Sequence, residues 1–139
     1  MNLSFLKIDR VTSKCDYAHH ADWIECLSFN DLSKNRGPGA SSPIGRKEVR
    51  VSILQGIHSP TLFHMSTTGG HPIASAVFEK GLKNGDAKFT LQLRVRMTNV
   101  FFHSYHYDQD RTTGSIFDHM VLSCDTLAFE FGSALQLSH

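Results

Sequence analysis

The chain has 139 residues, 40% of them hydrophobic, and its 14 basic and 13 acidic side chains leave a net charge of +1. This length suits one domain with its own core, here residues 1–139. The balanced charge argues against a nucleic-acid partner, and no apolar run approaches the roughly 20 residues that cross a bilayer. The N-terminus lacks the basic and apolar regions of a signal peptide. Cys15, Cys26 and Cys124, an odd number and widely spaced, are typical of free thiols in a reducing cytosol.

The first third of the chain contains short strand patterns around one long irregular segment. Phe5–Ile8 and Trp23–Phe29 are predicted strands, and Arg46–Gln55 alternates cleanly between apolar and polar residues. Between them, Asn30–Gly45 has no periodicity and contains Gly37-Pro38-Gly39. A loop of this length is usually either a functional arm or a disordered segment.

One short helix is predicted after the third strand. Ser59 is a natural N-cap, Pro60 suits the first helical position, and Gly69 or Gly70 can end the helix. A helix of about ten residues is stable only when packed on a sheet. It offers three side chains for burial: Leu62, Phe63 and Met65.

The next element is a hairpin from Ile73 to Thr98. Its Asn84-Gly85 pair favours a two-residue type I′ turn, because both central residues of that turn need positive φ. Such a turn places Phe78 opposite Leu91. One face then collects apolar side chains and the other polar ones, which supports the hairpin. The predicted apolar face comprises Ala74, Ala76, Phe78, Leu82, Ala87, Leu91, Leu93 and Val95.

A closing strand is predicted from Asp118 to Phe131, while Val100–Tyr107 extends the strand before it. The apolar positions change from even to odd midway, and a β-bulge near Asp125 would keep them all on one face. The pattern as a whole predicts a mainly β fold, a small antiparallel β-barrel or sandwich with one short α-helix and an extended loop.

Histidines offer the main candidates for chemistry. His19-His20, near Cys15, Asp16, Asp22 and Cys26, could be drawn as a metal site, but the usual zinc spacings are missing. His103 and His106 lie three apart in a predicted strand, which places them on opposite faces. We therefore expect no metal ligands and no cofactor.

Other catalytic patterns are also missing from the sequence. It has no G-x-S-x-G elbow, and Cys26 and Cys124 occupy apolar strand positions where cysteine behaves as a small hydrophobe. Arg50, Arg94 and Arg96 form a possible basic stripe on a polar sheet face. The chain is predicted not to be an enzyme.

Several segments, in order, resemble the haemolysin-coregulated protein family of bacterial type VI secretion systems. The most specific is Asp22-Trp23-Ile24-Glu25 with Ser28-Phe29, similar to the family's D-W-I-E-x-x-S-F segment. Ser59-Pro60-Thr61-Leu62-Phe63 matches the start of its helix, and Gly70–Ala76 resembles its next strand entry. The pattern from Met120 to Phe131 resembles its last strand. Departures are Met65, Pro72, and the phenylalanines in place of a terminal Trp and Tyr.

The resemblance implies a tube subunit: a homo-hexameric ring that stacks inside a contractile sheath, beneath a spike protein, and is ejected into target cells. It implies small effectors in the channel, a cytoplasmic location before firing, and secretion without a signal peptide. It also implies a ring-stacking loop within Asn30–Gly45 and a channel-lining polar face. The candidate stacking residues are Lys34, Asn35, Arg36, Gly37, Pro38 and Ile44, and the candidate lining residues are Gln92, Arg94 and Arg96.

Two other classes of function stay open from the sequence alone. One is a metal-dependent β-barrel enzyme that uses the His19/His20 region. The other is a monomeric binding module whose arm captures a partner.

Overall fold

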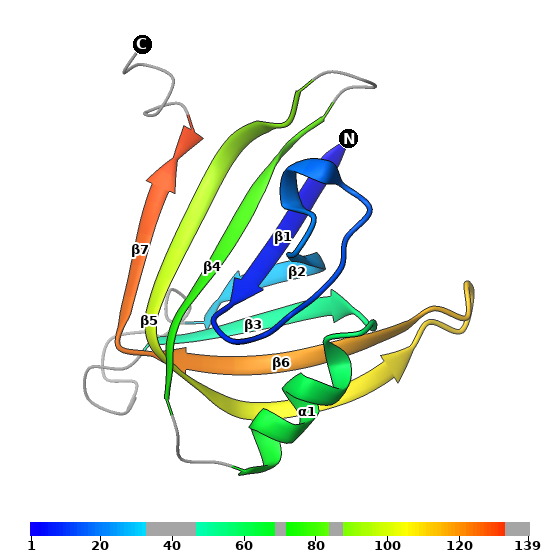
Figure 1. Ribbon diagram of the computed structural model, residues 1–139, viewed down its shortest axis with the longest axis vertical. Coiled ribbons are helices and arrows are strands. Elements are labelled where there is room, and N and C mark those ends of the chain that lie inside the picture. Colours follow the sequence, from blue (N-terminus) through cyan, green and yellow to red (C-terminus); the bar gives the residue numbers. More distant parts are fainter. Residues whose placement is uncertain (33–46, 69–71, 84–87, 133–139) are drawn as a thin grey trace.

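The computed structural model describes residues 1–32, 47–68, 72–83 and 88–132 (Figure 1). The candidate stacking residues, and the glycines predicted to end the helix, lie outside the described residues. The elements in chain order are β1 (Asn2–Ile8), the 3-10 helix η1 (Ala18–His20), β2 (Ile24–Asp31), β3 (Lys47–Leu54), α1 (Ser59–Thr68), β4 (Ile73–Leu82), β5 (Thr90–Gln109), β6 (Ile116–Cys124) and β7 (Thr126–Phe131).

Six antiparallel strands close into a barrel, as Figure 1 shows. They follow the order β4-β1-β2-β3-β6-β5, and the pairing of β4 with β5 completes the circle. The last strand, β7, lies outside this circle and pairs with the first half of β5. The predicted antiparallel barrel with one short helix is therefore confirmed.

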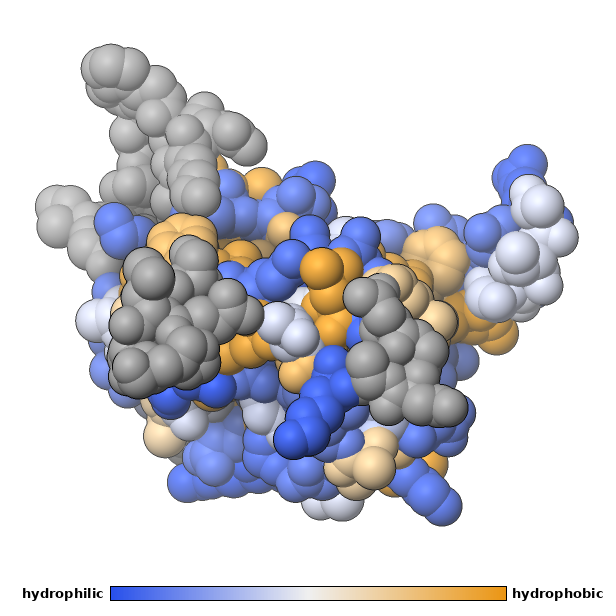
Figure 2. All heavy atoms as spheres, turned by 90° about the horizontal axis from the view of Figure 1, so that it is seen from above, coloured by the Kyte–Doolittle hydropathy of each residue, from blue (hydrophilic) through white to orange (hydrophobic). Residues whose placement is uncertain are grey.

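The core is made by strand alternation, which points every second side chain into the barrel. In β3, Val49, Val51 and Ile53 are all fully buried, as their spacing predicted. Outside, the surface is largely hydrophilic with separate apolar areas (Figure 2). The other strands contribute the rest of the barrel core: Leu6, Ile8, Ile24, Cys26, Ile73, Ala76, Phe78, Val95, Met97, Val100, Met120, Leu122 and Cys124.

The β4–β5 hairpin forms as predicted, but the predicted register is wrong. Phe78 pairs with Val95, four residues beyond the expected Leu91. A shift of four preserves the alternation, so Ala76, Phe78 and Val95 are buried as predicted, whereas Ala74 is exposed and Ala87 lies outside the described residues. After a bulge at Lys80/Gly81, the ladder ends at Leu82↔Thr90, which leaves residues 83–89 between the strands. The proposed turn residues, Asn84-Gly85, lie outside the described part of the chain.

Packing of Phe89 accounts for the shifted register. Its ring contacts Phe5 at 5.8 Å and His19 at 4.8 Å between centroids. The ring also covers Gly81, where an added Cβ would lie 2.5 Å from Phe89 Cζ and 2.3 Å from the Thr90 carbonyl oxygen. These contacts hold Phe89 beside Phe5 and Gly81, which fits a ladder that ends at Leu82↔Thr90.

The parity change predicted near Asp125 occurs there, but it is a corner between two strands and not a bulge within one. β6 pairs with β3 and with the second half of β5, whereas β7 pairs with the first half of β5. The Asp125 amide donates to the Thr98 carbonyl at 2.9 Å, and Asn99 Nδ2 donates to Asp125 Oδ2 at 2.8 Å. Because β7 leaves the closed circle, Phe131 is 58% exposed, contrary to its predicted inward position.

Helix α1 begins at Ser59, yet it buries fewer side chains than predicted. Leu62 is fully buried and Met65 packs partly against the core, but Phe63 is 57% exposed. The Ser59 hydroxyl accepts a hydrogen bond from the Gly56 amide and donates one to Asp118 Oδ2 at 2.8 Å. Ser59 therefore ties the helix to β6.

None of the three cysteines, Cys15, Cys26 and Cys124, forms a disulfide, and the last two are buried as predicted. Within the described ranges, no helix is long and apolar enough to cross a membrane.

Candidate functional site

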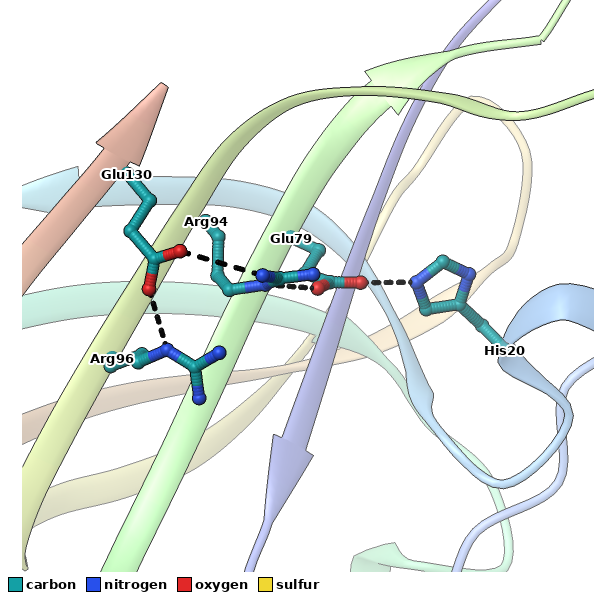
Figure 3. A network of polar contacts seen from close by, with 5 residues as sticks. All are labelled: His20, Glu79, Arg94, Arg96 and Glu130. Atoms are coloured by element: carbon teal, nitrogen blue, oxygen red, sulfur yellow. Dashed lines mark hydrogen bonds and ion pairs between the residues drawn. The ribbon is translucent and has the colours of Figure 1, made fainter. Parts of the chain in front are cut away.

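A row of charged side chains crosses the outer face of β4, β5 and β7 (Figure 3). Strand pairing creates it, because Glu79 lies opposite Arg94, which lies opposite Glu130 on the next strand. Arg96 is two residues further along β5 on the same face. Residues directly opposite in an antiparallel pair are close enough for their charges to interact. We call His20, Glu79, Arg94, Arg96 and Glu130 the charged row.

The contacts within the charged row are short and continuous. Arg94 Nε donates to Glu79 Oε2 at 2.6 Å, and its Nη1 lies 3.5 Å from Glu130 Oε2. Arg96 Nε donates to the other Glu130 oxygen at 2.6 Å. Exposure rises along the row, from 10% for the Glu79 side chain to 26% for Arg94 and 53% for Arg96. One end is therefore a buried ion pair and the other is an ordinary surface contact.

The buried end of the row is covered by η1. His20 stacks on Phe5 with ring centroids 4.1 Å apart, and its Nε2 lies 2.7 Å from Glu79 Oε1. A carboxylate only accepts hydrogen bonds, so Nε2 carries the proton here. The other ring nitrogen, Nδ1, contacts Nδ1 of His19. Because η1 and the stacked His20 ring cover it, Phe5 is fully buried although it lies on the outer face of β1.

The electrostatics of the row favour ionised carboxylates. Burial by itself raises the pKa of Glu79, but hydrogen bonds from His20 and Arg94 outweigh burial and hold that pKa below its ordinary value. The hydrogen bond from Arg96 likewise lowers the pKa of Glu130. In return, the hydrogen bond to Glu79 raises the pKa of Arg94. The two arginines and two glutamates cancel in charge, and the row forms a fixed, nearly neutral polar surface.

Of the three candidate lining residues, Arg94 and Arg96 share one face of β5, whereas Gln92 is the extra residue at the bulge, because Lys80 pairs with Leu93 and Gly81 with Leu91. Gln92 and Arg96 are exposed, whereas Arg94 is half-buried between its two carboxylate partners. The sequence placed Glu79 on the same polar face as Arg94, but it did not identify Glu130 or His20 as part of this surface. In the predicted register Glu79 faced Thr90, and only the shift of four residues brings it to Arg94. Arg50, the third member of the predicted stripe, is on β3 and pairs with Val121.

The histidine pairs considered for metal binding are engaged in other contacts. Both ring nitrogens of His20 have partners, Glu79 and His19. His106 lies opposite His119 on β6, with ring centroids 5.2 Å apart. The bulge at Phe102/Ser104 interrupts the regular alternation from which opposite faces for His103 and His106 were predicted. Among the residues that the structure describes, no three His, Cys, Asp or Glu side chains are grouped to hold a metal ion.

A second polar group lies at the base of the β5–β6 hairpin. The Asp118 carboxylate is fully buried and accepts hydrogen bonds from Ser59 Oγ at 2.8 Å and from the Tyr105 hydroxyl at 2.5 Å. Gln55 Nε2 lies 3.5 Å from its other oxygen. Burial, followed by the hydrogen bond to Asp118, raises the pKa of Tyr105, so its hydroxyl remains a donor. These residues form the floor of a surface hollow of about 450 Å³.

Sequence comparison does not classify the chain. No protein-family profile matches it. No curated protein matches it either.

Comparison with solved structures is informative about the fold. Hcp1 from Salmonella typhimurium has a TM-score of 0.77 and 19% identity, with 94% of this chain and 85% of that chain covered. Hcp3 from Pseudomonas aeruginosa, a secreted protein, has a TM-score of 0.74 and 9% identity, with 96% and 93% covered. A type VI secretion system effector from Yersinia pestis has a TM-score of 0.68 and 16% identity, with 92% and 88% covered. Over nearly its whole length, the chain has the fold of the Hcp proteins.

Proposed function

We propose that this chain is a structural subunit of the inner tube of a type VI secretion system, and not an enzyme. The observation that carries the proposal is the agreement in fold over 94% of the chain with Hcp1 and over 92% with a type VI secretion system effector. The ordered resemblance of its sequence segments to the same family supports it independently. A rigid barrel whose surface charges are paired with one another also suits a wall better than a site of turnover.

In this proposal six copies form a ring, and rings stack within a contractile sheath beneath a spike protein. The chain is cytoplasmic before firing and leaves the cell through the apparatus, without a signal peptide, a cofactor, bound nucleic acid or membrane insertion. Small effectors travel in the channel. Closed rings of identical subunits are built from one repeated contact, so a single surface pair suffices for assembly.

The mass of the purified protein tests the proposal. We expect a particle about six times the 15.6 kDa chain mass by light scattering, and rings in electron micrographs. A monodisperse monomer at micromolar concentration would contradict the tube role and favour the binding module. Stoichiometric zinc, iron or nickel in protein purified without chelator would favour the metal-dependent enzyme.

The channel is proposed to be lined by the face that carries Arg94 and Arg96, with Gln92 at its bulge. Support comes from the charged row, which presents many polar groups but little net charge. Such a wall stays hydrated without holding cargo by strong attraction. A gold label on Arg96→Cys is expected inside the ring in micrographs, because the Arg96 side chain lies on this face and is 53% exposed. A label on the outer rim would refute the assignment.

Stacking is proposed to use the loop residues Lys34, Asn35, Arg36, Gly37, Pro38 and Ile44. The support is the position of this segment in the resemblance, together with the functional use of most long loops. Deleting residues 34–42 should preserve the ring mass and reduce tube formation. Loss of the ring itself would show that the loop belongs to the ring contact.

A further inference from the structure

The β5–β6 hairpin projects beyond the barrel, and one of its faces continues the barrel interior into solvent. Tyr105 lies opposite the buried Met120, Tyr107 opposite Asp118, and Gln109 opposite Ile116. Directly paired residues share a face, so this inner face runs out along the hairpin. The projection is plain in Figure 1 at the yellow and orange strands, and Figure 2 shows that its tip is hydrophilic.

Large apolar side chains are exposed around the base of the hairpin. Tyr107 is 73% exposed and Ile116 is 41% exposed, and on the helix side Ile57 and Phe63 are also exposed. The exposed rings of Phe63 and Tyr107 lie together, because both line one hollow, and grouped apolar side chains that face water mark a contact with another protein. Phe63, Tyr105 and Tyr107 form the walls of the hollow, and we call this feature the aromatic hollow.

The floor of the aromatic hollow is negatively charged and held in place. Its lining includes Asp118, and the three side chains that donate to this carboxylate, Ser59, Tyr105 and Gln55, are all uncharged. A buried negative charge beneath aromatic walls favours a cation, and arginine above lysine, because the planar guanidinium also stacks on aromatic rings.

This chain presents such an arginine at the tip of the same hairpin. Arg111 is exposed at the apex of a turn that is fixed by local hydrogen bonds. Asp110 Oδ1 accepts from the Thr112 amide at 2.8 Å, and the Asp110 amide donates to the Ser115 carbonyl at 2.9 Å. Gly114, at φ +77°, allows the chain to reverse there. A tip ordered before contact loses little entropy when it docks.

We propose that the aromatic hollow receives Arg111 from a second copy of this chain, so that each hairpin tip docks at the hairpin base of its neighbour. The contact is head-to-tail, because tip and hollow are different surfaces, and repetition of such a contact closes a ring. The contact between two copies stands without the proposed function, and only the closure of the ring rests on it. Aromatic and arginine side chains in a partly enclosed pocket are the usual sources of interface energy.

Site-directed crosslinking tests this contact directly. Thr112→Cys places a thiol on the tip and Ile57→Cys places one on the rim of the hollow, while Arg111 and the aromatic walls are kept. With a short bismaleimide, the double variant should give a denaturing-gel ladder that ends at the closed ring. A mixture of the two single variants should give crosslinked dimers only. All variants carry Cys15→Ser, because Cys15 is only half-buried whereas Cys26 and Cys124 are buried, and the Cys15→Ser protein alone controls for the remaining native thiols.

Charge reversal supplies a second readout. Arg111→Glu should raise the concentration needed for half-assembly by at least about tenfold. Arg10→Glu is the matched control, because the Arg10 side chain is 78% exposed elsewhere on the surface. It should leave the concentration needed for half-assembly unchanged. If Arg111→Glu forms rings normally and the double-cysteine variant gives no ladder, this contact is overturned and the tube role stays intact. A wild-type chain that stays monomeric would overturn both.

Discussion

Glu79 is the acceptor at the buried end of the charged row, where His20 and Arg94 both donate to it. Glu79→Gln keeps the shape of the side chain but removes its charge. We expect a loss of about 3 kcal/mol in the free energy of unfolding, because Arg94 loses its shorter ion pair and because His20 and Arg94 contact different Glu79 oxygens, so one of them would face the NH2 group of Gln. Urea unfolding measures this loss.

Glu130→Gln is the control for that variant, since it removes the same charge at the exposed end of the row. Its effect should be clearly smaller, because water screens exposed ion pairs. Equal losses at the two positions would contradict the gradient in burial. The lowered pKa of Glu79 also makes the stability of the fold depend on pH. The stabilisation by Glu79 is fully present above the ordinary pKa of 4.5, and it is lost as the pH falls through the lowered pKa.

His58 gives a second dependence on pH. Its ring is buried between Ser13 Oγ at 2.8 Å and the Leu54 carbonyl at 2.8 Å, and burial lowers its pKa from 6.5. The unfolded chain therefore takes up a proton at a pH where the folded chain does not. Stability should be complete above pH 6.5 and fall as the pH drops below it.

The measurement is the urea midpoint between pH 7.5 and 5.5. His58→Gln keeps a donor for the Leu54 carbonyl but cannot titrate, so its midpoint should change less over this range. An equal slope in both proteins would assign the effect to another of the nine histidines.

Leu62 is the most deeply buried side chain of helix α1. Leu62 is fully buried, so Leu62→Ala should cost about 2–5 kcal/mol in the free energy of unfolding. Phe63→Ala removes a larger side chain that is 57% exposed and should cost much less stability. Thermal unfolding of the two variants distinguishes them. A larger loss for Phe63→Ala would mean that the helix packs through its other face.

The elements were predictable where local pattern and burial agree. Alternation identified Val49, Val51 and Ile53, and the cap residues located α1. The register of β4 against β5 was not predictable, because it depends on Phe89 packing against Phe5, which is distant in sequence. With the register misplaced, the partners of Arg94 could not be found either. The charged row is therefore a product of tertiary packing, although its arginines were noticed as a stripe.

At the scale of the whole molecule, the barrel closes through β1, which pairs with both β4 and β2. Deleting residues 2–8 should leave two open strand edges, and open edges invite association with other chains. We expect this variant to lose its cooperative unfolding transition and to aggregate. Light scattering and urea unfolding check both effects, and a monomer that still unfolds cooperatively would contradict the role of β1.

The same strand has a consequence for the order of events during synthesis. Asn2 pairs with Leu82, and Ile8 pairs with Ala76, so β1 leaves the ribosome long before its partner β4. The hairpins β4–β5 and β5–β6 join neighbouring segments and need only short loops to close, whereas β1 carries the largest loop-closure entropy in the sheet. β2 follows β1 closely and can cover one edge of it, but the nascent chain must wait with the other edge unpaired until β4 is made. During that interval the apolar side chains of β1 are a natural binding site for a chaperone.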